Sequence, residues 1–391
     1  MLHQLQDKKK IIPILSLGFR PFFLSAGIFS VLAMLAWLVS FQNSMIPIAP
    51  GLSAIQWHAH EMLYGYAMAV LAGFLLTAVR NWTGQPTLEG GSLLFIWLLW
   101  LSARITINFE ISLDLAMFSD LAFALMLLVG IARPIIKSRQ WKQLAILFKI
   151  LLLMLGNTLF YLGQMGKIDS GVQWGLYTGL FIVLAIILTI GRRVIPFFIE
   201  KGVAEKVTLK NSKWLDIFSL ILLLILFMQI AFTTLAAFTS ITAFLLFVVH
   251  VIRLKFWYTP GIWKVPLLWG LYLGYGFVVI GFGLLALSAA FSEMYFPAIH
   301  ALAVGGIGMI TFSMMSRVSL GHTGRSIQNP PKPIAIGMAF LLLAAFVRVF
   351  MPLLFSQLYS SWIIFAQVLW ILAFSCFVLA YSGILIKPNE R

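Results

Sequence analysis

Twelve long apolar runs dominate this sequence of 391 residues and restrict the folds that it can adopt. A helix needs roughly 20 mostly apolar residues to cross the hydrocarbon core of a bilayer, and each run is close to that length. Only helices and closed barrels pair all their backbone polar groups inside lipid. Unbroken runs such as Leu220–Phe227 lack the alternation of barrel strands. The sequence therefore predicts an all-α, polytopic membrane helix bundle with about 12 transmembrane helices.

The predicted spans divide the chain into a single polytopic membrane domain over residues 1–391. Residues 1–21 are expected to form an N-terminal tail, 22–386 the bundle, and 387–391 a C-terminal tail. The division between the seventh and eighth spans is the least marked, because only Thr233 and Thr234 interrupt the apolar run there. The spans are 22–41, 57–79, 92–109, 113–133, 143–165, 172–191, 214–232, 235–253, 267–289, 296–316, 334–354 and 361–386.

The composition agrees with a membrane protein and excludes several other classes. Hydrophobic residues make up 61% of the chain and charged residues only 10%, whereas soluble domains have about 45–50% and 25%. A single cysteine, Cys376, excludes a disulfide scaffold, a thiolate metal site and an iron–sulfur cluster. The apolar run that starts at Phe22 is too long for a cleavable signal peptide, and more runs follow it.

The formal net charge of +15 is explained by topology. If the N-terminus is cytoplasmic and the spans alternate, all but three of the 27 Lys and Arg residues fall in inner loops, as the positive-inside rule requires. The three exceptions are Arg104, Lys167 and Arg348. The charge needs no anionic partner such as nucleic acid, and both termini are predicted to be cytoplasmic.

Two histidines and a carboxylate open the second span. His58, His60 and Glu61 are ionisable groups inside a membrane segment, which makes them candidates for function. Since each residue of a helix turns about 100°, the two histidines point about 160° apart and cannot readily ligate one mononuclear centre. Each could serve a different site, with Glu61 as hydrogen-bond acceptor for a ligating ring. A polar helix cap at the interface is the structural alternative.

A third histidine, His300, begins the tenth span at the same predicted depth as His58 and His60. Two helices with histidine at equal depth suit axial ligation of haem. They also suit copper, with imidazole and methionine ligands from Met62, Met68 or Met294. Small residues follow His300, and they either leave a slot for a flat macrocycle or let helices pack closely. These residues are Ala301, Ala303, Gly305, Gly306 and Gly308.

Basic residues gather at the opposite, inner ends of the same two helices. The second span ends in Arg80-Asn81-Trp82-Thr83-Gly84, and the tenth in the segment from Arg317 to Arg325, which also contains Thr-Gly. This parallel indicates a faint internal duplication or a chance similarity. The group could meet carboxylates, such as haem propionates, or a small anion; snorkelling and positive-inside anchoring are the alternative. Its members are Arg20, Arg80, Arg317, His322 and Arg325.

Four segments together resemble the NnrS family, and they cover both halves of the chain. They are Gly18-Phe19-Arg20-Pro21-Phe22-Phe23, Trp57-His58-Ala59-His60-Glu61-Met62, residues 72–84 and residues 300–325. The resemblance implies a multi-pass protein of the bacterial inner membrane that contains haem and copper. It also implies a role in nitric-oxide (nitrosative) stress response and denitrification-linked tolerance, with nitric oxide or a nitrosyl species as ligand. It defines no reaction, electron donor or substrate turnover.

The alternative from another class is a 12-helix secondary transporter of a small solute. Arg104 or Asp120 would then line the path, and Lys149 is a further ionisable residue within a span. Transport sites usually lie near the midplane of the membrane, whereas the ionisable residues here concentrate near the two faces. The haem reading is therefore preferred, with His300 and either His58 or His60 as ligands. His58 is the slightly preferred partner, which leaves His60 for copper.

The orientation can be tested with reporter fusions. A reporter that is active only in the periplasm should be inactive when fused at the C-terminus or inserted in the 192–213 loop, because the distribution of basic residues places both in the cytoplasm. A cytoplasmic reporter should be active at the same two positions, and activity of the periplasmic reporter at either one would refute the topology.

Overall fold

The computed structural model describes residues 11–43, 46, 49, 51–108, 112–233 and 235–389. Residues 1–10 and 390–391 of the two predicted tails lie outside the described residues. The described part of the chain contains no strand, and twelve of its helical segments are long and apolar enough to cross a membrane. The predicted all-helical class and number of spans are therefore confirmed.

The helices follow one another through short connections, some of which contain a single 3₁₀ turn. Two spans, the second and the tenth, are divided into α-, π- and α-helical segments. The helices are α1 (Phe19–Gln42), α2 (Ala54–His60), the π-helix η2 (Glu61–Ala67), α3 (Met68–Thr83), α4 (Gly91–Asn108), α5 (Leu113–Lys137), α6 (Leu144–Gln164), α7 (Gly171–Gly202), α8 (Lys213–Phe232), α9 (Ala236–Phe256), α10 (Pro266–Leu287), α11 (Tyr295–His300), the π-helix η6 (Ala301–Gly308), α12 (Met309–Gly321), α13 (Lys332–Leu354) and α14 (Tyr359–Ile386).

The boundaries agree with the predicted spans within a few residues, with one clear exception. The weakly marked division between the seventh and eighth spans is real, because α8 ends at Phe232 and α9 begins at Ala236. The exception is α7, which continues past residue 191 to Gly202. Ile195 and Ile199 in this extension are buried, so packing against neighbouring helices continues the helix after its apolar run ends.

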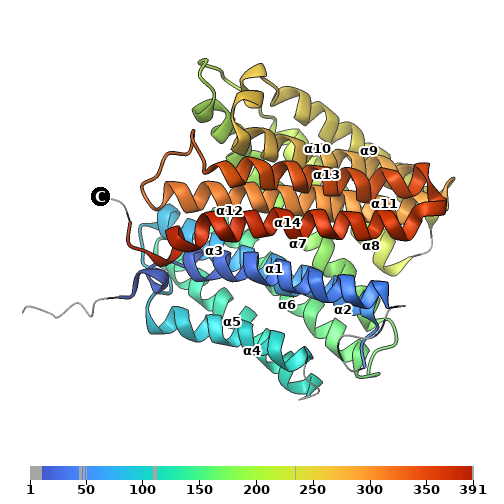
Figure 1. Ribbon diagram of the computed structural model, residues 1–391, viewed down its shortest axis with the longest axis horizontal. Coiled ribbons are helices and arrows are strands. Elements are labelled where there is room, and N and C mark those ends of the chain that lie inside the picture. Colours follow the sequence, from blue (N-terminus) through green and yellow to red (C-terminus); the bar gives the residue numbers. More distant parts are fainter. Residues whose placement is uncertain are drawn as a thin grey trace, which may run out of the picture.

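Figure 1 shows the two ends of the bundle at the left and at the right. We call the left one the proximal end, and it carries both ends of the described chain, the start of α1 and the ends of α3, α12 and α14. The distal end carries the end of α1 and the starts of α2 and α11. α1 packs against α3 and α14, while α10 packs against η6 and α12. Which end faces the cytoplasm stays a prediction.

The two histidine-bearing spans lie at the centre of the bundle. In the most apolar stretch of each span, 89% of the residues are buried in the second and 72% in the tenth, against 28% in α8. Both contain a π-helical segment that begins directly after the histidine, η2 after His60 and η6 after His300. Such segments are rare and occur mostly at functional sites.

The small residues after His300 let neighbouring helices pack closely against the tenth span. A Cβ atom on Gly305 would lie 2.2 Å from the ring of Phe277 on α10, and one on Gly308 would lie 2.8 Å from Trp370 on α14. Glycines of α10 fit against the tenth span in the same way, since a Cβ on Gly281 would lie 2.6 Å from Leu302. Of the two interpretations of the small residues, the structure supports close helix approach.

Candidate functional site

The start of α2 fixes the direction of both of its histidines. Ser53 caps the helix: its Oγ accepts a hydrogen bond from the Gln56 amide, and the Gln56 side chain accepts one from the Ser53 amide. Such a reciprocal cap satisfies two backbone donors at the helix start. The helix is regular through His60, so His58 and His60 lie on different faces, as their spacing predicts.

His58 faces α1 and the tenth span. Its ring stacks on the indole of Trp37, with ring centroids 4.6 Å apart and planes 9° from parallel. Its Nδ1 atom is buried and has no hydrogen-bond partner among the described residues. A buried polar nitrogen without a partner is costly, and a bound water, ion or ligand is among the explanations for such an atom in a native site.

His300 lies close enough to His58 for the two rings to interact electrostatically. Its Nδ1 atom donates a hydrogen bond to the carbonyl oxygen of Phe296, at 2.8 Å. Its Nε2 atom therefore carries a lone pair, which accepts a hydrogen bond from Nη2 of Arg348 on α13, at 3.1 Å. Arg348 also acts electrostatically on His58, and no ion pair joins it to a described acidic residue.

These residues form what we call the distal site: Trp37, His58, His300 and Arg348. A metal-bound histidine usually donates its second ring N–H to a carbonyl or carboxylate, and the His300–Phe296 bond has this arrangement. The described residues contain no group of three or more His, Cys, Asp or Glu arranged to hold a metal ion. The distal site instead offers two imidazoles from two helices, beside one arginine that has no acidic partner among the described residues.

His60 points away from the distal site into a buried ion network. Its Nδ1 lies 2.9 Å from Oε1 of Glu61, and its Nε2 lies 2.9 Å from Oδ1 of Asn157 on α6. Asp120 Oδ2 is 3.8 Å from the same Nε2. Both ring nitrogens of His60 are therefore held by hydrogen-bond partners inside this network.

Arg104 on α4 completes the network. Its Nη2 donates to Asp120 Oδ2 at 2.6 Å, and its Nε lies 3.2 Å from Glu61 Oε2. Tyr161 donates to the same Asp120 oxygen at 2.7 Å. His60, Glu61, Arg104 and Asp120 are at most 4% exposed, so the ion pairs that Arg104 makes with the two carboxylates are buried. His60 therefore has no free ring nitrogen for the copper ion expected there.

The inner arginine group is not a single site. Arg20 binds the end of α14, where Nη1 donates to the carbonyls of Leu385 and Lys387 at 2.8 and 2.7 Å, and Nη2 donates to Asn389. Arg80 forms a half-exposed ion pair with Glu89 at 2.8 Å. These two arginines have structural partners.

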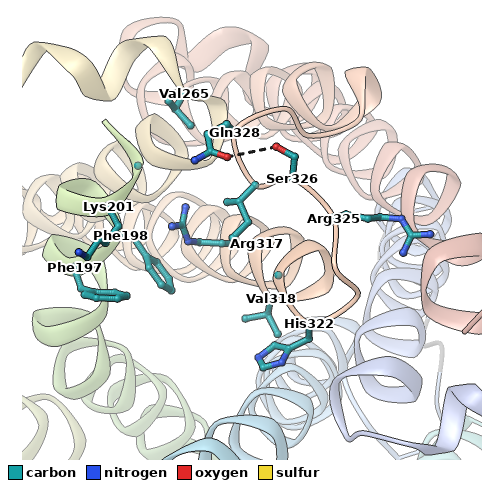
Figure 2. Close-up of a pocket in the computed structure, with 13 residues that line it drawn as sticks. Phe197, Phe198, Lys201, Val265, Arg317, Val318, His322, Arg325, Ser326 and Gln328 are labelled. Atoms are coloured by element: carbon teal, nitrogen blue, oxygen red, sulfur yellow. Dashed lines mark hydrogen bonds between the residues drawn. The ribbon is translucent and has the colours of Figure 1, made fainter. Parts of the chain in front are cut away.

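Arg317, His322 and Arg325 line a pocket at the proximal end (Figure 2). His300 and Arg317 are separated by seventeen positions on one span, or roughly 25 Å along a helix. A haem held at the distal site cannot place its propionates against Arg317. Of the two expected partners of the arginine group, only a separate anion is compatible with this arrangement.

Sequence reasoning did not identify the role of Trp37 and Arg348 at the distal site. Arg348 was recognised only as one of three outer basic residues, and that exception to the positive-inside pattern is the signal that pointed to it. Arg104 and Asp120 were recognised as ionisable residues, but their partners were not. Their ion pair joins α4 and α5, and sequence spacing alone does not show which helices are neighbours.

Comparison with known proteins gives one match. The family model described as NnrS protein matches residues 13–389, which is nearly the whole chain. No curated protein matches the sequence.

The ion network predicts a large effect of removing its arginine. Arg104→Met leaves Glu61 and Asp120 with too little positive charge, so we expect the folded state to lose about 3–5 kcal/mol. The melting temperature of the detergent-solubilised protein measures this. Arg80→Met, which breaks a half-exposed pair, should cost about 0–1 kcal/mol. Adding Asp120→Asn to Arg104→Met should restore part of the loss; equal melting of the Arg104→Met variant and the wild type would contradict the network.

Proposed function

This chain belongs to the NnrS family, and from that membership and the distal site we propose that it is a haem-binding inner-membrane protein of the bacterial nitric-oxide response. Family membership supports the general role, a membrane protein of the nitric-oxide response. The observation that carries the haem proposal is the pairing of His58, with its unpartnered Nδ1, and His300 on two central helices. We assign these two histidines as the axial ligands.

The residues of the distal site fit a haem group. Two neutral imidazoles from different helices supply the axial ligand set of a low-spin haem. Trp37 holds the plane of the His58 ring by stacking, and the carbonyl of Phe296 fixes the tautomer of His300. When bound, haem would supply a one-electron redox centre.

Arg348 supplies the positive charge of the distal site. Its guanidinium has no ion-pair partner among the described residues and lies beside both rings. A planar guanidinium binds carboxylates through two parallel hydrogen bonds, so Arg348 is suited to a haem propionate. The Nε2 atom of His300, which would hold the iron, accepts the Arg348 hydrogen bond.

Copper binding stays a prediction of the family resemblance. Both ring nitrogens of His60 are hydrogen-bonded in the ion network, so the residues there do not fit a copper ion. We derive no step through copper.

The second candidate, a transporter of a small solute, is favoured by the ion network alone. Arg104 and Asp120 are buried and charged, as residues of a transport path often are. Arg104 is already paired with Asp120 and Glu61, although its Nη1 atom has no hydrogen-bond partner among the described residues. A stable purified protein without a haem absorption band would favour this candidate.

The haem assignment predicts the spectra of histidine variants. The purified protein should show a Soret band of six-coordinate, low-spin haem. His58→Ala and His300→Ala should each give a five-coordinate spectrum or lose haem, because each removes one axial ligand. Arg80→Met, at the other end of the bundle, should keep the wild-type spectrum at matched expression. Wild-type spectra of both histidine variants would disprove the assignment, and a change in His60→Ala alone would show that the other histidine of α2 is the ligand.

The cellular role predicts a nitric-oxide phenotype. A strain that lacks the gene should grow more slowly than its parent under nitric oxide, and not without it. Wild-type protein and Arg80→Met should restore growth, whereas His58→Ala and His300→Ala should not, since they lack the haem site. Equal growth of the parent and the deletion strain across nitric-oxide concentrations would contradict the proposed role even if haem is bound.

A further inference from the structure

A cavity of about 550 Å³ opens at the proximal end of the bundle, far from the distal site. One wall is the extension of α7, with Phe197, Phe198 and Lys201, and the opposite wall is the segment that follows α12. The end of α12, with Arg317 and Val318, forms the floor (Figure 2). Helices and a loop distant in sequence thus build one pocket where the apolar spans end.

Arg317 is the residue that makes this pocket unusual. Its side chain is only 7% exposed, and its Nε and Nη1 atoms are buried without a hydrogen-bond partner among the described residues. Its guanidinium lies over the ring of Phe198, 3.9 Å from the centroid. Figure 2 shows it between the α7 wall and the loop that carries Ser326 and Gln328. Stacking satisfies the face of a guanidinium, but its N–H donors in the plane require an acceptor.

The other polar residues of the pocket add positive charge. Lys201 and Arg325 line it together with His322, and no described acidic residue does. Burial lowers the pKa of His322 below its usual value, so this ring is neutral at pH 7. The positive charge of the pocket comes from Lys201 and Arg317, and no described carboxylate lies in the lining.

The remaining lining is apolar and determines which anions fit. Phe197, Phe198, Val265, Val318 and Ile327 surround the charged groups. A small hydrated ion would leave these side chains in contact with water, whereas an anion that carries an apolar body would cover them. Arginine binds phosphate through its planar fork, and basic pockets between membrane helices accept phosphate head groups.

We propose that this pocket binds a phosphate group attached to an apolar body, with Arg317 as its principal ligand and Lys201 as a second cation. Phe198 holds the Arg317 guanidinium in place by stacking, and the apolar wall receives the rest of the molecule. The phosphate comes either from an anionic membrane lipid or from a soluble organic phosphate. Because the site is roughly 25 Å from His300 along the span, it is independent of haem binding.

The source of the bound phosphate can be identified with three probes added to the purified full-length protein in detergent. They are short-chain phosphatidylglycerol, short-chain phosphatidylcholine and inorganic phosphate, each titrated by calorimetry below the micelle-forming concentration of the lipid. Phosphatidylglycerol bound more tightly than both other probes indicates the lipid. Inorganic phosphate bound in the pocket, with no gain from the lipid tail, would contradict the apolar body of the proposed ligand.

Variants connect the binding to the pocket. Arg317→Met keeps an unbranched apolar side chain but removes the charged hydrogen bonds, so affinity for the bound probe should fall about ten- to a hundred-fold. Lys201→Met alters an exposed side chain that folding does not need, and it should weaken binding in the same direction. Arg80→Met, whose arginine is paired with Glu89, should bind as the wild type does. The proposal is overturned if no probe binds, or if Arg317→Met and Lys201→Met bind every probe with wild-type affinity.

Discussion

The buried polar network of His60, Glu61, Arg104 and Asp120 fixes the relative positions of the second, third and fourth spans. An unpaired charge inside a membrane protein costs several kcal/mol, so these helices must keep the register in which the four side chains meet. Asn157 and Tyr161 tie the fifth span to the same point. Since His58 precedes His60 by two residues on one regular helix, holding His60 inside the network directs His58 to the opposite face, where Trp37 and His300 lie.

The π-helical segments connect this network to the helix packing. In η2, a Cβ on Gly65 would lie 2.8 Å from Nη1 of Arg104, so only glycine allows the arginine to approach the backbone there. The carbonyl of Gly65 accepts a hydrogen bond from Trp100, which pairs a backbone group of η2 with a side chain of another helix. The second and tenth spans also end alike, since Gly84 and Gly324 both have positive φ, 64° and 80°. The Thr-Gly parallel in the sequence thus corresponds to a shared local structure at the ends of two spans that both carry a π segment after a histidine.

The sequence was sufficient for features that depend on composition and on regular helix geometry. Apolar run length predicted all twelve spans, and the 100° turn per residue predicted that His58 and His60 face different sides. Features that depend on neighbouring helices were not accessible. Nothing in the spacing showed that Arg104 pairs with Asp120, that Arg20 binds the end of α14 or that Phe277 occupies the space beside Gly305. The α7 extension was missed because buried Ile195 and Ile199 continue a helix beyond the apolar run that defined it.

The arginines of this protein differ more clearly in their hydrogen-bond and ion-pair partners than in their depth within the bundle. Arg20, Arg80 and Arg104 lie near the two faces of the bundle, and each is paired with a carbonyl or carboxylate. Arg317 and Arg348 lie at the same two levels, but no ion pair joins either to a described acidic residue. Desolvating a guanidinium is costly unless hydrogen bonds or an anion compensate it. Arg348 is hydrogen-bonded to His300 and Tyr359, whereas Nε and Nη1 of Arg317 have no partner among the described residues. The pairing of each arginine therefore separates the structural cations from the two on which the ligand proposals rest.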